Sequence, residues 1–247
     1  MKPVLPFLLL LLLTGCATPP RDTVFQTSTI DALIAGVYDG HMTCGELLSH
    51  GDTGIGTFDH LDGEMVVIDG TVYQVTADGA VHRPAASMTT PFATVCEFSP
   101  DTCVALDPGT DYASLKGVLD ARAPNRNLFY ALSITGRFSR MLTRSVPRQS
   151  KPYPPLTEVT AHQPRFTNSH VTGTIIGFRC PAYVKGINVP GYHLHFLNDD
   201  RTAGGHILDF TCAHATCDLD TLTRFTLVLP DTTGGFARAN LARDRSR

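Results

Sequence analysis

Three histidines lie close together in the C-terminal third of the chain, and their spacing could build a metal site. The segment 191–210 contains His193 and His195, separated by one leucine, and then His206. Side chains alternate between the two faces of a strand, so a His-x-His pair places both imidazoles on one face and the neighbouring apolar residues on the other. A polar run separates the two apolar stretches. The segment therefore reads as a β-hairpin with a turn between its strands.

The expected hairpin register brings the third histidine to the first two. If residues 199–202 form a four-residue loop, Asn198 pairs with Ala203, and His195 lies directly opposite His206 on the same face. Directly opposed residues have Cβ atoms about 4.5–5.5 Å apart. Three imidazoles would then converge within reach of one ion. Three histidines with a fourth position open are the ligand set of a catalytic zinc rather than of a closed structural zinc.

Other metals and folds also use histidine pairs, and the surrounding residues separate them. Neutral imidazoles suit copper, iron or nickel as well as zinc, but the iron triad of two histidines and a carboxylate needs an adjacent carboxylate, which is missing here. A cupin-type enzyme would need a glutamate a few residues after the pair, and residues 197–203 contain none. Zinc is the predicted metal. A lone buried histidine is more often a hydrogen-bonded core residue, so the prediction depends on having three at hairpin spacing.

Capping residues, turn residues and apolar patterns predict the helices and strands that must position the hairpin. Thr29 is a natural N-cap for a helix whose apolar residues recur over 30–37, and Thr43 with Glu46 fits a capping box for a second short helix. Further along, the pattern predicts short antiparallel strands from Gly54 onward, a helix over 111–122, a hairpin of strands 128–134 and 138–143 about Gly136, a helix over 155–163, and strands over 171–178 and 225–229.

The N-terminus has the layout of an export signal. Residues 1–15 carry Lys2 and then an apolar run that is too short to span a bilayer, which is typical of a signal peptide. The run ends in Thr-Gly-Cys16, which resembles a bacterial lipoprotein signal whose cysteine becomes lipidated. Residues 16–27 read as a tether and residues 28–247 as one folded domain. The expected location is the periplasm or cell envelope, with membrane contact only through a lipid on Cys16.

Composition excludes one class of partner and permits disulfides. The chain has 20 basic and 23 acidic residues, and removal of residues 1–15 takes away one lysine and changes the net charge from −3 to −4. With no basic patch, nucleic acid is not an expected partner. The apolar content of 43% supports a real core. In an oxidising compartment, Cys96 with Cys103 and Cys212 with Cys217 are locally plausible disulfides, the connectivity stays open, and Cys44 and Cys180 fit free buried thiols.

Two charged residues elsewhere could serve a metal site, although neither is informative by itself. Glu64 follows an Asp-Gly turn and opens an apolar strand, where a solvated strand end is the simpler interpretation. Arg144 lies in a polar stretch and could equally be a surface charge.

Several sequence blocks together resemble the α-acetolactate decarboxylases, over roughly Ile30 to Pro230. The blocks are GVYDG at 36–40, MTCGELL at 42–48, GIGTF at 54–58, LDGEMV at 61–66, PFA at 91–93, RSVPRQ at 144–149, KPYPPL at 151–156, GFRCPAY at 177–183 and the histidine hairpin. The resemblance implies an α/β fold of the α+β type, with mixed and antiparallel sheets in two closely packed halves and a few short helices.

The resemblance also implies a function and a set of roles. The expected reaction is zinc-dependent conversion of a small molecule, 2-acetolactate, to acetoin and carbon dioxide. His193, His195 and His206 match the family's zinc ligands. Glu64 and Arg144 match its active-site carboxylate and guanidinium, and Thr57 falls in a loop that lines the site. One departure is that the last glutamate is Glu158, whereas the family commonly carries a glutamate in its C-terminal tail.

A non-catalytic alternative stays open at this point. A surface lipoprotein that binds or buffers zinc needs the histidines, but it has no use for Arg144 and Glu64, so their joint presence favours catalysis. The sequence leaves the oligomeric state open, with a homodimer as one arrangement to test.

Overall fold

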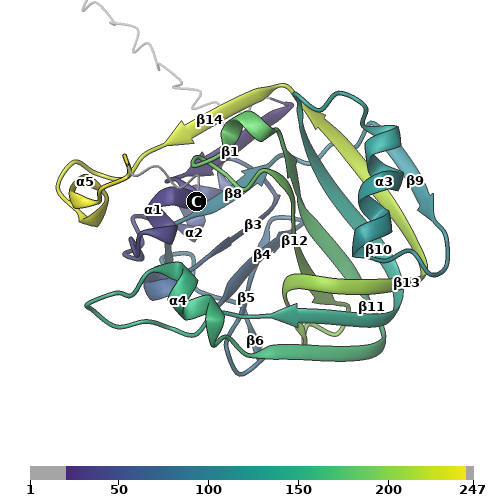
Figure 1. The fold of residues 1–247 in the computed structure, drawn as a ribbon, viewed down its shortest axis with the longest axis horizontal. Coiled ribbons are helices and arrows are strands. Elements are labelled where there is room, and N and C mark those ends of the chain that lie inside the picture. Colours follow the sequence, from purple (N-terminus) through teal and green to yellow (C-terminus); the bar gives the residue numbers. More distant parts are fainter. Residues whose placement is uncertain (1–20, 243–247) are drawn as a thin grey trace, which may run out of the picture.

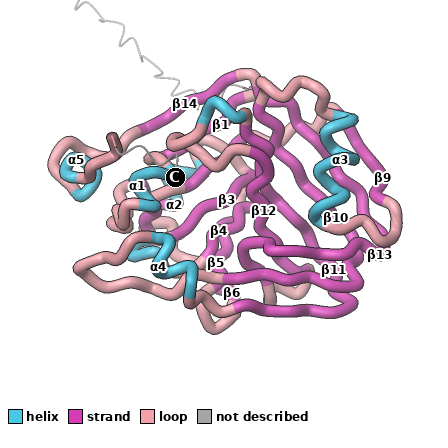
Figure 2. Tube along the Cα trace, viewed as in Figure 1, coloured by secondary structure: helices cyan, strands magenta, loops and turns pink. Residues whose placement is uncertain are grey.

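Two β-sheets form the body of the protein, and short helices lie around them (Figures 1 and 2). The structure is a computed structural model that describes residues 21–242, so the predicted signal peptide and Cys16 lie outside the described residues. The larger sheet has seven strands in the order β14 (Arg224–Val228), β1 (Thr23–Thr27), β8 (Ala93–Cys96), β3 (Thr53–Thr57), β4 (Glu64–Ile68), β5 (Thr71–Val75) and β6 (Val81–His82). Strands β1 and β14 run parallel and the other neighbours antiparallel, so the sheet is mixed.

The second sheet is antiparallel and closes on itself. Its strands are β10 (Phe129–Arg144), β11 (Arg165–Cys180), β12 (Gly191–Asn198), β13 (Gly204–Leu222) and β9 (Thr102–Leu106). Strand β10 pairs with β11 on one side and with β13 on the other, while β12 pairs with both β11 and β13. These four strands therefore form a closed ring. A two-stranded sheet joins β2 (Met42–Thr43) to β7 (Thr89–Thr90).

The helices are short, and the N-caps of α1 and α2 follow the predictions. They are α1 (Ile30–Ile34), α2 (Cys44–Leu48), α3 (Tyr112–Arg122), α4 (Leu156–Ala161) and α5 (Gly235–Arg238), with 3₁₀ turns at Asp59–Leu61 and Ala182–Val184. Thr29 caps α1, and Thr43 with Glu46 forms the capping box of α2. Helix α1 ends at Ile34, earlier than its apolar period, and Pro155 is the N-cap of α4.

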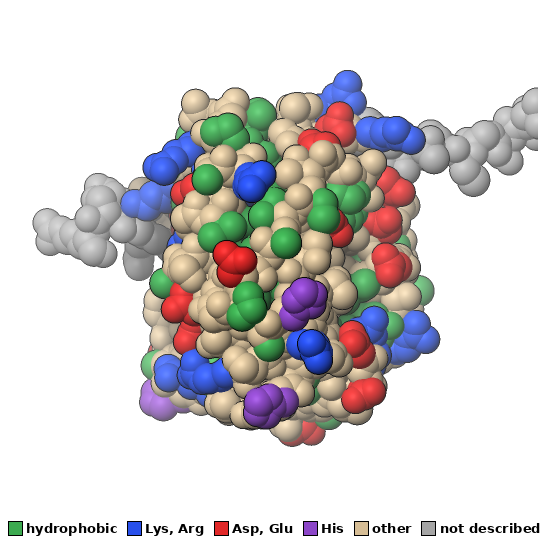
Figure 3. Space-filling model, turned by 90° about the vertical axis from the view of Figure 1, so that its right-hand side faces the viewer, with side chains coloured by type: hydrophobic (Ala, Val, Ile, Leu, Met, Phe, Trp, Pro, Cys, Tyr) green, Lys and Arg blue, Asp and Glu red, His purple; other side chains and the backbone are tan. Residues whose placement is uncertain are grey.

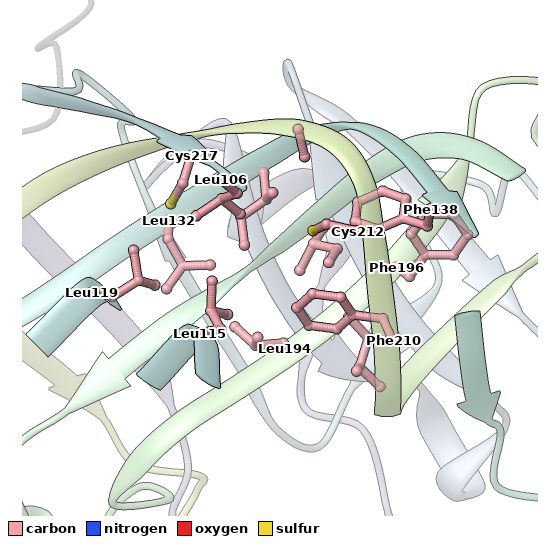
Figure 4. Packing of buried hydrophobic residues seen from close by; sticks show 14 of the residues in the cluster. Leu106, Leu115, Leu119, Leu132, Phe138, Leu194, Phe196, Phe210, Cys212 and Cys217 are labelled. Carbon is pink, nitrogen blue, oxygen red and sulfur yellow. The ribbon is translucent and has the colours of Figure 1, made fainter. Parts of the chain in front are cut away.

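Two of the four hydrophobic clusters in the described residues explain why the halves of the molecule pack closely. The first lies between the strands of the second sheet and α3, and Figure 4 shows Leu115 of that helix beside Leu194 and Leu119 beside Leu132, with Phe138, Phe196 and Phe210 further along the same cluster. The second cluster joins the two sheets, because it contains residues of β1, β3, β4, β5 and β8 together with residues of β10, β11, β12 and β13. The expected α+β class with mixed and antiparallel sheets in two packed halves is confirmed.

The predicted hairpin about Gly136 is wrong. Strand β10 continues through Gly136, and it pairs with β13 along almost its whole length. A Cβ atom at Gly136 would lie 2.3 Å from the carbonyl oxygen of His214 on β13. Glycine here permits a close approach of two backbones rather than a turn, a distinction that depends on a strand some 80 residues further along the chain and is invisible locally.

The tether predicted over residues 16–27 is also wrong for its last part. Residues 23–27 form β1, which lies inside the seven-stranded sheet between β14 and β8, with Val24 and Phe25 buried. Gln26 is buried too, and its side-chain amide donates to the carbonyl oxygens of Ser28 and Ile187, each at 2.7 Å. A strand that buries polar side chains through hydrogen bonds does not show the apolar alternation on which a sequence prediction depends.

The two predicted disulfides are absent from the described residues, in which six cysteines are free. Cys96 lies on β8 of one sheet and Cys103 on β9 of the other. Cys212 and Cys217 lie five positions apart on β13, which corresponds to roughly 16 Å along an extended strand and far exceeds the reach of a disulfide. Cys44 and Cys180 are free and buried, as expected.

The face of the molecule in Figure 3 carries side chains of mixed character. Figure 3 shows acidic, basic and small hydrophobic groups interspersed on one face, without a continuous basic area. No helix within residues 21–242 combines the length and the apolar character needed to cross a bilayer.

Candidate active site

The histidine hairpin has the predicted register. His195 lies directly opposite His206 in the pairing of β12 with β13. The backbone N–H of Asn198 donates to the backbone carbonyl of Ala203 at 2.9 Å. The alternation is also as predicted, because Leu194 and Phe196 point into the first hydrophobic cluster (Figure 4). The apolar face of β12 thus holds the strand in place while its other face carries the imidazoles.

The three imidazoles form one cluster. One ligand atom from each of His193, His195 and His206 lies within 4.8 Å of the other two, and the ring centroids are 5.0–5.3 Å apart. The Nε2 atom of His193 is 3.2 Å from Nδ1 of His206. This spacing lets three nitrogen atoms converge on one ion.

A backbone carbonyl of the other sheet orients His195. Its Nδ1 atom is 2.8 Å from the carbonyl oxygen of Met65 on β4, so Nδ1 carries the hydrogen and donates it. The Nε2 atom is then the bare nitrogen, and it is buried without a hydrogen-bond partner among the described residues. Metal-ligating histidines commonly donate their other ring N–H to a carbonyl or carboxylate, which fixes the tautomer. An unpaired, buried, bare nitrogen is what a metal ligand requires, and the donor set fits a transition metal such as zinc.

Burial keeps these histidines neutral. It lowers the pKa of His193 to about 4, with the Arg144 charge adding to the effect. Burial also lowers the pKa of His195 and His206 well below the usual value, and the neighbouring His193 adds to it. Only the neutral imidazole has a lone pair for a metal, so the three groups are ready to bind one at neutral pH.

Glu64 is buried beside the histidines and is not a solvated strand end. It opens β4, its residue is 7% exposed, and its Oε2 atom is 3.5 Å from Nε2 of His195. Burial raises the pKa of Glu64 to about 7, although the Arg144 charge and a hydrogen bond from the Val146 backbone oppose the rise. A carboxyl group with a pKa near the working pH is suited to proton transfer.

Arg144 is the last residue of β10 and reaches the same site. It lies opposite His206 in the pairing of β10 with β13. Gly205, just before that histidine, has φ +123°, and a Cβ atom there would lie 2.4 Å from the Arg144 carbonyl oxygen. Glycine at this position therefore lets the two strands close where the arginine and the histidine meet. The Nε atom of Arg144 is buried and unpaired among the described residues.

Thr57 is the last residue of β3, at the end of a strand rather than in a loop. It lies opposite Glu64 in the pairing of β3 with β4, and its hydroxyl donates to the Gly63 carbonyl at 2.7 Å. The hydroxyl oxygen can still accept a hydrogen bond. Thr57 lines the cavity and also ties down the residue that precedes Glu64.

All of these side chains line one cavity of about 340 Å³. Its remaining walls are mainly apolar and come from α1, α4, the 3₁₀ turn Asp59–Leu61, strand residues of β3 and β12, and loops. The lining residues that were not predicted as part of a site are Ile30, Leu33, Ile34, Leu61, Phe92, Val146, Leu156, Thr160, Val189 and Tyr192. The apolar period of α1 was visible in the sequence, but nothing there showed that it faces a site rather than the core.

The segment before α4 is tied to the chain that follows α1. The Tyr38 hydroxyl donates to the Pro154 carbonyl at 2.9 Å, the Tyr153 hydroxyl donates to Asp39 at 2.8 Å, and Lys151 pairs with Asp39 at 2.8 Å. Tyr153 also contacts the ring of His60. Asp39, Asp59 and His60 have metal-ligand side chains close together, but Asp39 is engaged by Tyr153 and Lys151, and Asp59 accepts from the Gly40 backbone at 2.7 Å and lies 3.1 Å from Nε2 of His60. The network fixes one end of α4 beside the cavity.

The comparisons with known proteins identify the family of this chain. Residues 24–243 match the model of the family described as alpha-acetolactate decarboxylase. A protein of that name from Methanosarcina mazei is 46% identical over 223 residues, covering 90% of this chain and 77% of the relative. One from Methylococcus capsulatus is 45% identical over 222 residues, covering 90% and 85%.

A solved structure supports the same assignment. The crystal structure of alpha-acetolactate decarboxylase from Bacillus subtilis has a TM-score of 0.87 and 39% identity, covering 90% of this chain and 94% of that one. The fold and the matched length thus agree with one family. The chain belongs to the alpha-acetolactate decarboxylases, which are carboxy-lyases.

Proposed function

We propose that this decarboxylase is zinc-dependent and converts 2-acetolactate to acetoin and carbon dioxide. The observation that carries the proposal is the convergence of three neutral imidazoles, a guanidinium and a buried carboxyl group on one cavity. A protein that only stores zinc has no need of the last two groups.

His193, His195 and His206 would hold the zinc ion. Bound there, zinc would act as a Lewis acid that stabilises the negative charge developing on the substrate oxygens. The hydrogen bond from His195 to Met65 keeps its ring in the ligating orientation.

The remaining groups act on the substrate. Loss of carbon dioxide breaks a carbon–carbon bond and leaves the electron pair on carbon, beside a ketone, so that an enediolate forms. Arg144 is permanently charged and offers donors to the carboxylate or to the enediolate. Glu64, directly or through a water molecule, delivers the proton to carbon. Thr57 and the apolar walls shape the space around the substrate.

An assay of acetoin formation tests the function and the metal together. Purified protein should release acetoin from racemic acetolactate. Removal of metal with a chelator should abolish the activity, because the metal held by the three histidines would supply the main stabilisation of the developing negative charge. One equivalent of zinc should restore the activity. Elemental analysis before and after chelation checks the metal content. Full activity of metal-free protein would rule out zinc dependence, and a zinc-loaded protein without activity would support zinc buffering instead.

We also propose that the enzyme is anchored to a membrane of the cell envelope through lipid on Cys16. Support comes from the sequence alone, in the short apolar run that ends at this cysteine. Two or more acyl chains give stable anchoring without a transmembrane helix. Mass spectrometry of the mature N-terminus should find an acylated Cys16, and Cys16→Ala should move the protein to the soluble fraction. An unmodified N-terminus that lies beyond residue 16 would contradict the anchor.

A further inference from the structure

Arg144 has a single side-chain partner among the described contacts, and that partner is neutral. Its Nη1 atom donates to the Oε1 atom of Gln163 at 2.7 Å. No ion pair within 4.0 Å involves Arg144 in the described part of the chain. Most buried guanidinium groups are paired with a carboxylate, because an unpaired buried charge is costly. Here an amide oxygen is the hydrogen-bonded partner, while the buried Glu64 carboxyl group acts on Arg144 electrostatically, without an ion pair within 4.0 Å.

The surroundings of Arg144 make this partner important. Arg165 lies directly opposite Arg144 in the pairing of β10 with β11, and like charges that face each other across a sheet repel. Gln163 comes two residues before Arg165 in the chain, in the short connection between α4 and β11. Its oxygen therefore holds the guanidinium in the cavity, although the charge opposite works against that position.

An amide and a carboxylate would have different consequences for an anion. Both can accept a hydrogen bond from the guanidinium and orient it. A carboxylate would also neutralise its charge and compete with any anionic ligand for its donors, whereas an amide leaves the positive charge available. The side chain at position 163 thus decides whether Arg144 has a carboxylate as its hydrogen-bonded partner before substrate arrives.

We propose that Gln163 is a positioning residue, which orients Arg144 while leaving its charge free to bind the substrate carboxylate. The inference rests on the proposed function for the identity of that carboxylate. Gln163 acts through Arg144 and has no direct part in the chemistry. It also couples Arg144 to α4, whose Leu156 and Thr160 line the cavity.

Two substitutions separate orientation from charge. Gln163→Glu keeps the acceptor and the shape but adds a negative charge, so we expect KM for acetolactate to rise about tenfold or more. Gln163→Ala removes the acceptor, so we expect kcat/KM to fall about tenfold to a hundredfold, which is the effect of losing a hydrogen bond to a charged group. Asn168→Asp on β11, opposite Met141, makes the same amide-to-carboxylate change away from Arg144 and is the control, with less than a twofold effect.

Ligand binding gives a readout that does not depend on turnover. Calorimetric titration should show that zinc-loaded Gln163→Glu binds 2-hydroxy-2-methylpropanoate about tenfold more weakly than the unsubstituted protein. Binding of the neutral amide of this acid should change less than twofold. If the role of Gln163 were merely structural, the substitution would lower the affinity for the acid and for its amide by the same factor. It would also lower the zinc content or the thermal stability of the protein.

The possible results are distinguishable. The proposal would be overturned if Gln163→Glu bound the anion as tightly as the unsubstituted protein does. It would also be overturned if the affinities for the anion and for the amide fell by the same factor. A further outcome is that the unsubstituted protein forms no acetoin while Gln163→Glu still loses affinity for the anion and not for the amide. In that case the proposed function would fail and the role of Gln163 would stand. Normal acetoin formation by both Gln163 variants would leave the function intact and refute the role.

Discussion

His195→Ala is expected to lose both the metal and the activity, with zinc affinity falling by more than about 100-fold. Loss of an outer partner of a ligating histidine costs 10-fold to 100-fold in metal affinity, and loss of the ligand itself should cost more. His195 is the most enclosed of the three histidines, at 1% exposure, and its orientation is fixed by Met65. Alanine would leave a hole next to Glu64 that no other imidazole can fill. Zinc content by elemental analysis and acetoin formation measure the result.

A histidine on one of the same strands provides the control for this experiment. His206 and His214 both lie on β13, but His214 is exposed and is absent from the cluster. His206→Ala should behave like His195→Ala and His193→Ala, whereas His214→Ala should keep full metal content and activity. Stoichiometric zinc in all three cluster variants would refute the hairpin site.

Glu64→Gln is expected to keep the metal and to lower kcat by about 10²–10⁴-fold, which is the usual contribution of a general acid or base. Glutamine has the same shape and can still accept the hydrogen bond from the Val146 backbone, so the fold around it should hold. It cannot carry and release a proton. Because burial raises the pKa of Glu64 to about 7, the native carboxyl group can do both near neutral pH.

The measurement for Glu64 needs metal analysis beside kinetics. Glu97→Gln is a matched control, since Glu97 is an exposed glutamate directly after β8. It should leave kcat and zinc content unchanged. Loss of zinc in Glu64→Gln would instead make this carboxylate a ligand, an outcome that its 3.5 Å distance from Nε2 of His195 makes worth testing. Full activity of Glu64→Gln with zinc bound would exclude the proton-transfer role.

Local features of the chain were predicted correctly because their causes are local. The register of the histidine hairpin depends only on a four-residue loop and on the alternation of side chains along two strands, so His195 could be placed opposite His206 without any other part of the molecule. The caps of α1 and α2 are similar, because a side chain and a backbone amide three residues apart decide them. Family membership was also readable from the linear blocks.

Three of the predictions that failed depend on segments that are far apart in the sequence or in the fold, whereas the Cys212–Cys217 disulfide failed because both residues lie on one extended strand. Residues 23–27 become a strand because β14, about 200 residues later, pairs with them. Gly136 stays within a strand because the backbone of β13 approaches it. Cys96 and Cys103 are close in the chain and lie on different sheets. Propensity and spacing cannot report such pairings, since the stabilising contacts come from distant segments.

The candidate active site likewise combines features with local causes and features that depend on distant segments. Strand alternation and turn length leave one arrangement for the histidines, with two on one face of a strand and a third beside them, so this part of the site follows from the chain alone. Only the tertiary structure brought Glu64 of the seven-stranded sheet and Arg144 at the end of β10 to those histidines, through packing of the two sheets and closure of β10 against β13. It alone also placed Gln163 against Arg144, because a hydrogen bond between an irregular loop and a strand end leaves no periodic pattern in the chain.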